Sequence, residues 1–260
     1  MTSQGAIAGT KPRPLFRPES SVLLIVAAAA WLATIVVARD MGVMRGTMGL
    51  GLFGFRGVWT LMMAAMMLGS IAPLASLYAR TMRDHVVRRA ASLAIGYLSV
   101  WVAAGLVGFA LAAGAQRLAD NAPGWAQGLA VGTCVVCGIY QMTSFKERCL
   151  QHCRSPLGHL LRYTSLRGPF VDTRVGIDHG AWCLGCCWAL MLLLITFGVM
   201  NVLAMVVLAA VIVVEKIFKP GRWFSVGVGL VALALGIAIW ADPSLAPGLH
   251  ATSNAVMGGM

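Results

Sequence analysis

The stretch that decides the fold is Ala181–Phe218, AWCLGCCWALMLLLITFGVMNVLAMVVLAAVIVVEKIF. This apolar run is far longer than the roughly 20 residues that cross a bilayer as one helix. Its natural break is Gly198–Asn201. We therefore expect two short helices, near Trp182–Phe197 and Asn201–Glu215, which form a hairpin or a re-entrant pair. The run predicts a helical membrane protein.

The composition of the whole chain agrees with this prediction. Of 260 residues, 59% are hydrophobic and 11% are charged, and the mean hydropathy is +0.81, whereas soluble domains carry roughly 25% charged residues. Further apolar runs of bilayer-spanning length lie at 21–38, 57–79, 90–113, 125–142 and 223–240. We expect an all-α, polytopic membrane bundle of about seven spans.

The basic residues predict how the bundle is oriented. The net charge is +11, and a cytoplasmic amino terminus places most Lys and Arg residues on the cytoplasmic side, as the positive-inside rule requires. The exceptions are Arg39, Arg45, Arg56 and Arg117. Because the basic residues lie in short loops, and no stripe of cations interleaved with aromatic residues or nucleic-acid motif occurs, we expect no nucleic-acid partner.

Three segments follow from this topology. Residues 1–20 are expected to be a polar cytoplasmic segment, 21–241 a single transmembrane helical domain, and 242–260 a short tail. The first apolar run exceeds the roughly 7–15 residues of a signal-peptide core, so we interpret it as a retained helix. A polar loop at 143–180 is expected on the cytoplasmic side.

A group of thiols lies at the start of the long apolar run. His179, Cys183 and Cys187 repeat at i, i+4 and i+8, so a helix places them on one face. Cys186 lies on the adjoining part of that face. Thiolate and imidazole ligands of this kind suit Cu(I) or, less specifically, Zn(II).

The polar loop at 143–180 supplies a second group. One helical turn there would present Cys149, His152 and Cys153 together. A lone cysteine is usually a small buried hydrophobe, but five cysteines and two histidines at two adjacent junctions between loop and membrane indicate a metal site. All seven are candidate ligands, with copper favoured and zinc as the alternative.

Cys134 and Cys137 support a competing interpretation. They form a C-x-x-C within the fourth predicted span, the kind of pair that a membrane thiol–disulfide oxidoreductase uses. We favour helix packing for this pair, and a cytoplasmic cysteine cluster would be kept reduced, which favours ligands over disulfides. The other alternative is a structural or assembly subunit of a membrane metalloenzyme. Neither a P-loop nor a phosphorylatable D-K-T motif is present, so we do not expect an ATP-driven pump. We favour a role other than catalysis.

Methionines form a second candidate set. Met62 and Met66, and likewise Met63 and Met67, are i, i+4 pairs that would form two adjacent thioether rows on the second span. Met191, on the fifth span, is a further candidate of the same kind. Methionine is more often an adaptable core filler, but beside a thiolate cluster these thioethers are candidate transit ligands for Cu(I).

Two polar residues lie at membrane depth, where such groups are costly and often functional. Asn201 stands at the proposed hairpin, and Glu215 closes the sixth span. Each also has a structural interpretation. Asn201 would cap a helix at the turn, and Glu215 would pair with an interfacial Lys or Arg.

Several of these motifs resemble the signature of a bacterial family of unknown function whose members are described as predicted metal-binding integral membrane proteins. The matching residues are CxxxCRSP at 149–156, HGxxCLGCCWALM at 179–191, GVMN at 198–201 and EK at 215–216. The segment Met62–Met67, followed by Pro73, is similar too. Gly69 stands where we would expect a proline shortly after the methionines.

The resemblance covers roughly residues 55–220. It implies metal binding and supports a multi-pass protein of the bacterial inner membrane. With the residue types, it leads us to predict a protein that traffics or exports copper in the lipid bilayer, with a metallochaperone or a metalloenzyme as its partner. No reaction and no oligomeric state are predicted.

Overall fold

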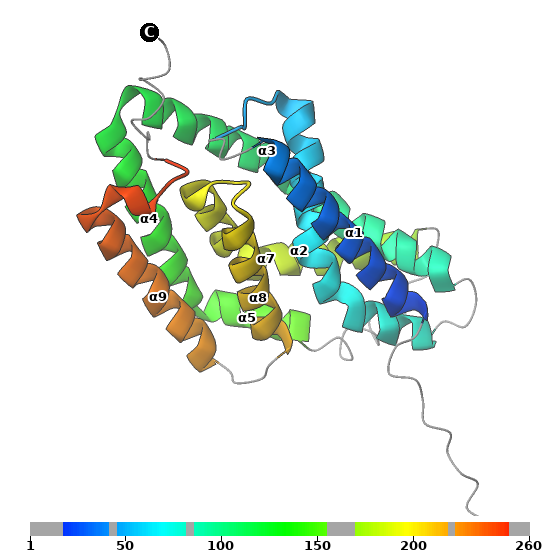
Figure 1. Cartoon of the computed structure of the whole chain (residues 1–260). Helices are drawn as coiled ribbons and strands as arrows, with labels where there is room; N and C mark the ends of the chain where they lie inside the picture. Colours follow the sequence, from blue (N-terminus) through cyan, green and yellow to red (C-terminus); the bar gives the residue numbers. More distant parts are fainter. Residues whose placement is uncertain (1–17, 42–45, 82–85, 155–169, 218–221, 250–260) are drawn as a thin grey trace, which may run out of the picture.

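The described part of the chain is all-helical, as predicted. The computed structural model describes residues 18–41, 46–81, 86–154, 170–217 and 222–249, and these ranges contain no β-strand. The elements in chain order (Figure 1) are α1 (Pro18–Met41), α2 (Leu52–Thr81), α3 (Val86–Asn121), α4 (Pro123–Gln141), α5 (Ser144–Arg154), α7 (Val171–Phe197), α8 (Val202–Ile217), α9 (Arg222–Ala241) and the 3-10 turn η1 (Pro243–Leu245).

The predicted spans correspond to helices of different lengths. Helices α1, α2, α3, α7 and α9 are each long and apolar enough to cross a membrane, and the pair α4 and α5, bent by 66°, forms a sixth candidate. Helix α8 has 16 residues, or about 24 Å, which is less than the roughly 30 Å of a bilayer core. The predicted short sixth helix is therefore observed, and it is not among the helices long enough to cross a membrane alone.

The fifth span is longer than predicted. Helix α7 begins at Val171 rather than near Trp182 and has 27 residues, because the polar residues 171–180 continue the helix instead of forming a loop. Much of the predicted loop at 143–180 is therefore helical, since α5 occupies its start and the first turns of α7 occupy its end. Residues 155–169 of that loop lie outside the described residues, as do 1–17 of the amino-terminal segment and 250–260 of the tail.

The break between α7 and α8 lies where the sequence predicts it. Gly198 has φ +96°, a conformation that glycine adopts without strain. Asn201 caps α8, since its Oδ1 accepts a hydrogen bond from Ala204 N at 3.1 Å, and its Nδ2 donates to Phe197 O at 3.1 Å. The capping interpretation of Asn201 is thus supported.

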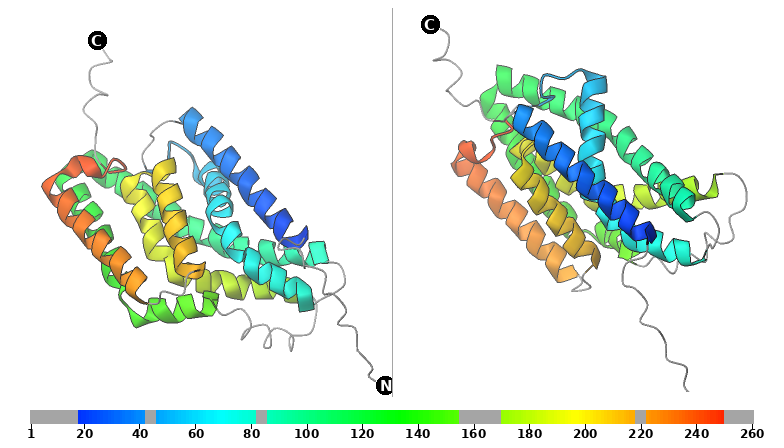
Figure 2. Two further views of the ribbon diagram at one scale, coloured as in Figure 1. Left: turned by 60° about the horizontal axis from the view of Figure 1, so that its bottom comes forward. Right: turned by 45° about the vertical axis from the view of Figure 1, so that its right-hand side comes forward.

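The bundle consists of two outer helix pairs around the α7–α8 hairpin. Figure 2 shows α1 beside α2 at one side, α4 beside α9 at the other, and α7 and α8 between them. Helix α3 packs along α7, and small residues allow the two backbones to approach. A Cβ on Gly176 of α7 would meet Leu93 O, and one on Gly96 of α3 would meet Thr173 O. This packing places the cysteines of α7 inside the bundle.

Candidate metal centre

Helix α5 is oriented toward α7 by a sharp bend after α4. The bend lies at Met142–Thr143, and Thr143 caps the new helix by accepting a hydrogen bond from Lys146 N at 3.2 Å. At the other end of α5, Arg154 Nε donates to Glu215 O on α8 at 2.7 Å. The helix is thereby fixed beside α7 and α8, with its cysteines close to those of α7.

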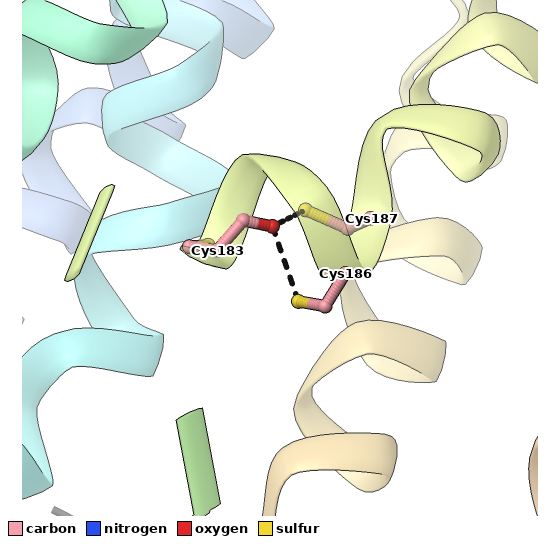
Figure 3. Close-up of side chains that lie close together, drawn as sticks. All are labelled: Cys183, Cys186 and Cys187. Carbon is pink, nitrogen blue, oxygen red and sulfur yellow. Dashed lines mark hydrogen bonds between the residues drawn. The ribbon is translucent and has the colours of Figure 1, made fainter. Parts of the chain in front are cut away.

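Three cysteines of α7 form the centre of the site. The Sγ atoms of Cys183, Cys186 and Cys187 all lie within 4.8 Å of one another, and each residue is at most 2% exposed. The Cys186 and Cys187 thiols donate to the Cys183 carbonyl at 3.1 and 2.9 Å (Figure 3). The helical spacing predicted this grouping.

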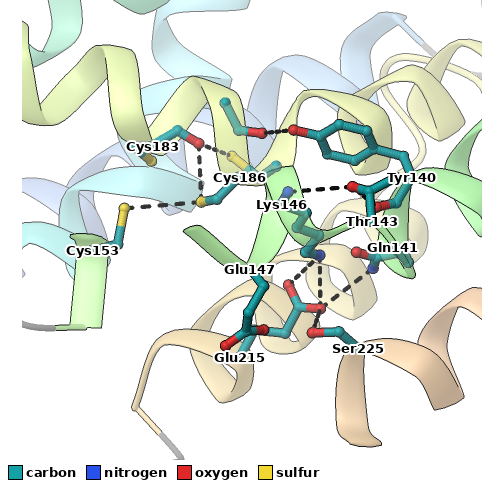
Figure 4. Close-up of polar contacts among 12 residues, drawn as sticks. Tyr140, Gln141, Thr143, Lys146, Glu147, Cys153, Cys183, Cys186, Glu215 and Ser225 are labelled. Atoms are coloured by element: carbon teal, nitrogen blue, oxygen red, sulfur yellow. Dashed lines mark hydrogen bonds and ion pairs between the residues drawn. The ribbon is translucent and has the colours of Figure 1, made fainter. Parts of the chain in front are cut away.

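A fourth sulfur comes from α5. The half-buried Cys153 has its Sγ 4.0 Å from Cys186 Sγ (Figure 4). A metal–sulfur bond of about 2.3 Å places three sulfurs of a trigonal ion about 4.0 Å apart, and two opposed sulfurs of a linear one about 4.6 Å apart. The sulfur separations fit a soft ion such as Cu(I) with little rearrangement.

The remaining predicted ligands have other neighbours. Cys149 is buried with its Sγ against the backbone of Gly185. The ring of His152 stacks on Trp182 with centroids 4.3 Å apart, and its Nε2 lies 3.7 Å from an Asp178 carboxylate oxygen. His179 is also buried. Among the described residues, only the three α7 cysteines form a group of ligand atoms within 4.8 Å, so a ligand role for Cys149, His152 and His179 stays a prediction.

Cys183 has polar neighbours that the sequence analysis missed. Its Sγ lies 2.9 Å from Tyr97 Oη and accepts a hydrogen bond from Lys216 Nζ at 3.0 Å. Lys216 Nζ also donates to Ser70 Oγ at 2.9 Å. The signal that could have identified Lys216 is its position just before the end of an apolar run, because polar groups at membrane depth are often functional.

Beside the sulfurs lies a buried ion pair. Lys146 Nζ is 2.8 Å from both carboxylate oxygens of Glu215, and both side chains are at most 2% exposed. Gln141 and Ser225 donate to the same carboxylate at 3.4 and 3.0 Å (Figure 4). The pairing proposed for Glu215 is therefore present, although its partner is a fully buried lysine rather than an interfacial one. The network joins α4, α5, α8 and α9.

Residues 56–239 match the family model of PpoB2, a copper chaperone. The chain belongs to this family. The PpoB2 match includes all seven cysteines and agrees with the resemblance to a metal-binding family inferred from the motifs. Comparison with curated proteins and with solved structures found no match.

Within the range that matches PpoB2, the methionines of α2 lie in the core. Met62, Met63, Met66 and Met67 are each at most 2% exposed, and Met191 of α7 is 4% exposed. Ser70, which contacts Lys216, follows Met67 by one turn of α2. The methionines therefore lie on the helix that contacts the centre, and their role as copper ligands stays a prediction.

The C-x-x-C of α4 is buried between helices. Cys134 and Cys137 are fully buried, and a Cβ on Gly236 of α9 would lie 3.2 Å from Cys134 Cβ. All seven cysteines of this PpoB2 family member are free thiols. The burial of both thiols, with Cys134 against a glycine of the neighbouring helix, agrees with the packing interpretation.

Proposed function

We propose that this chain is a membrane-embedded copper chaperone that holds Cu(I) on Cys153, Cys183, Cys186 and Cys187 and passes it to a partner. Four sulfurs contributed by two helices, with separations that fit a two- or three-coordinate ion, carry this proposal. Soft thiolates are the ligands that Cu(I) prefers. Membership of the PpoB2 family supports copper as the cargo.

The thiols are arranged for ligand exchange. Cys153 is only half-buried, whereas the α7 cysteines are buried, so Cys153 would meet a donor first. Its sulfur would take copper from a donor thiolate and share it with Cys186, 4.0 Å away. The ion stays Cu(I) throughout, each new Cu–S bond replaces one in the donor, and the proton of the incoming thiol passes to the donor sulfur that is released. No electron is transferred in this sequence.

Exposed tryptophans support a position for the centre near one membrane boundary. Trp223 and Trp240, at opposite ends of α9, are 84% and 70% exposed, and about 26 Å of helix separates them. Tryptophan favours the membrane interface. Ser225 lies one turn or less from Trp223 and donates to Glu215, the residue before Lys216. We therefore place the thiols at the boundary marked by Trp223.

The charge distribution supports assigning this boundary to the cytoplasm. Arg222 begins α9 here, and Arg148 and Arg154 lie on the neighbouring α5. Under the positive-inside rule these residues indicate the cytoplasmic face of a bacterial inner membrane. Met67 and Met63 lie one and two turns of α2 beyond Ser70, toward the opposite boundary. They would accept copper from the thiols on a route across the membrane, to a metalloenzyme or another acceptor.

Metal content of the protein, purified anaerobically and loaded with Cu(I), tests the proposal. We expect about one copper per chain in the wild type and in the control Cys134→Ser/Cys137→Ser, which removes two equally buried thiols. The variant Cys183→Ser/Cys186→Ser/Cys187→Ser should retain none. Equal copper in both variants would refute the proposed site, and oxidised thiols without copper in the wild type would favour the oxidoreductase alternative.

A further inference from the structure

Lys216 stands out among the residues around the sulfurs. Its ammonium donates to Cys183 Sγ at 3.0 Å and to Ser70 Oγ at 2.9 Å. The adjacent carboxylate of Glu215 is already paired with Lys146. Within the described ranges, Lys216 forms no ion pair with a carboxylate. Its positive charge is therefore directed at the thiol centre.

We propose that Lys216 is the counter-ion of the metal centre and makes it select a singly charged soft cation over a divalent one. This inference rests on the proposed function and specifies its cargo. A metal bound about 2.3 Å from Cys183 Sγ would lie within roughly 5 Å of Lys216 Nζ. At that separation, in surroundings that exclude most water, a unit charge has a large effect on binding.

Charge balance explains the direction of the selectivity. Cu(I) with two thiolates carries one negative charge, which the ammonium of Lys216 neutralises. Zn(II) with the same two thiolates is neutral, so the ammonium of the half-buried Lys216 would remain without a compensating charge beside the centre. A third thiolate adds the same negative charge to both complexes, so on any one set of thiolates the Zn(II) complex is one charge more positive than the Cu(I) complex and gains less from the ammonium. The fixed positive charge thus favours the monovalent ion.

The position of Ser70 gives a second way to test this role. Ser70 shares the Lys216 ammonium with Cys183 but bears no charge. An aspartate at position 70 would place a carboxylate next to the same ammonium and neutralise it without removing the lysine. In both cases, with an aspartate at position 70 or without Lys216, the site would carry no free positive charge.

The test is the ratio of Cu(I) to Zn(II) affinity, measured anaerobically by competition with chelators on the full chain. Lys216→Gln should lower the preference for copper by at least about tenfold, and Ser70→Asp should lower it in the same direction. Lys216→Arg, which keeps the charge, should retain the wild-type ratio. The matched control is Arg222→Gln, which removes an exposed positive charge at the start of α9 and should also leave the ratio unchanged.

The outcomes separate this inference from the proposed function. A wild-type ratio in folded Lys216→Gln, while copper still binds, would overturn the counter-ion role and leave the chaperone proposal intact. Wild-type protein that binds no Cu(I) would overturn both. If Lys216→Gln does not fold, Ser70→Asp decides, since an unchanged ratio there contradicts a role for the ammonium charge.

Discussion

Helices α4 and α7 each contain closely spaced cysteines, and of these two sets only the α7 set forms a candidate metal centre. Cys134 and Cys137 of α4 share the three-residue spacing of Cys183 and Cys186 of α7, and all four are buried. Cys134 of the α4 pair lies against Gly236 of α9. The α7 group faces a sulfur from α5 and the ammonium of Lys216. The spacing of cysteines within one helix is therefore not enough to make a metal centre. The α7 group differs from the α4 pair because a second helix adds a sulfur and Lys216 adds a charge.

The largest expected effect comes from detaching the second helix. Glu215→Ala removes the partner of Lys146 and leaves a buried ammonium unpaired, which should lower the free energy of unfolding by about 3–5 kcal/mol. Because this pair holds α5 against α8, Cys153 should also react faster with a thiol-alkylating reagent. Thermal unfolding in detergent and alkylation kinetics measure the two effects.

The control for this prediction removes the ion pair as a whole. Lys146→Met/Glu215→Met replaces both charges with apolar side chains of similar length, which often restores stability. Most of the loss seen in Glu215→Ala should be recovered. A double variant as unstable as the single one would show that the ion pair is not what holds α5 in place.

A smaller effect isolates the sulfur that α5 contributes. Cys153→Ser should weaken Cu(I) binding by at least about tenfold, since even the loss of a group that only supports a ligand costs about that much, and the three α7 sulfurs limit the loss. Cys134→Ser is the matched single-thiol control and should bind copper as the wild type does. Equal affinity in both variants would remove Cys153 from the site.

The same comparison shows what local sequence can predict. The break at Gly198–Asn201 and the grouping of the α7 cysteines were predicted, because glycine conformation and helical periodicity are local properties. The start of α7 at Val171 was not predicted. Its first turns are polar, and they are helical because they pack on α3. Gly96 of α3 and Gly176 of α7 allow the two helices to come into close contact.

The charged and polar part of the centre could not be predicted locally. Tyr97 reaches Cys183 across 86 positions of the chain, and Lys216 reaches it across 33. Such contacts depend on how α3 and α8 pack against α7, and no periodicity in one helix specifies them. The ligand role predicted for His152 and His179 depends on such packing too and stays a prediction, and the ring of His152 stacks on Trp182.

The smallest expected effect lies at the turn of the hairpin and should leave the centre unchanged. Asn201→Ala removes the cap of α8 and should cost about 1 kcal/mol of stability. Thermal unfolding should detect this loss, while copper content stays at the wild-type level. Loss of copper in this variant would contradict this prediction, because it would mean that the geometry of the α7–α8 turn affects the position of the sulfurs.

The measurement that tests the central claim most directly is X-ray absorption at the copper edge of the loaded, full-length protein. We predict a first shell of two or three sulfurs at about 2.3 Å, with the sulfur count lowered in Cys186→Ser, because Cys186 lies between the α5 and α7 thiols. A first shell dominated by nitrogen or oxygen would contradict the account, since it would place copper on the histidines or elsewhere in the chain.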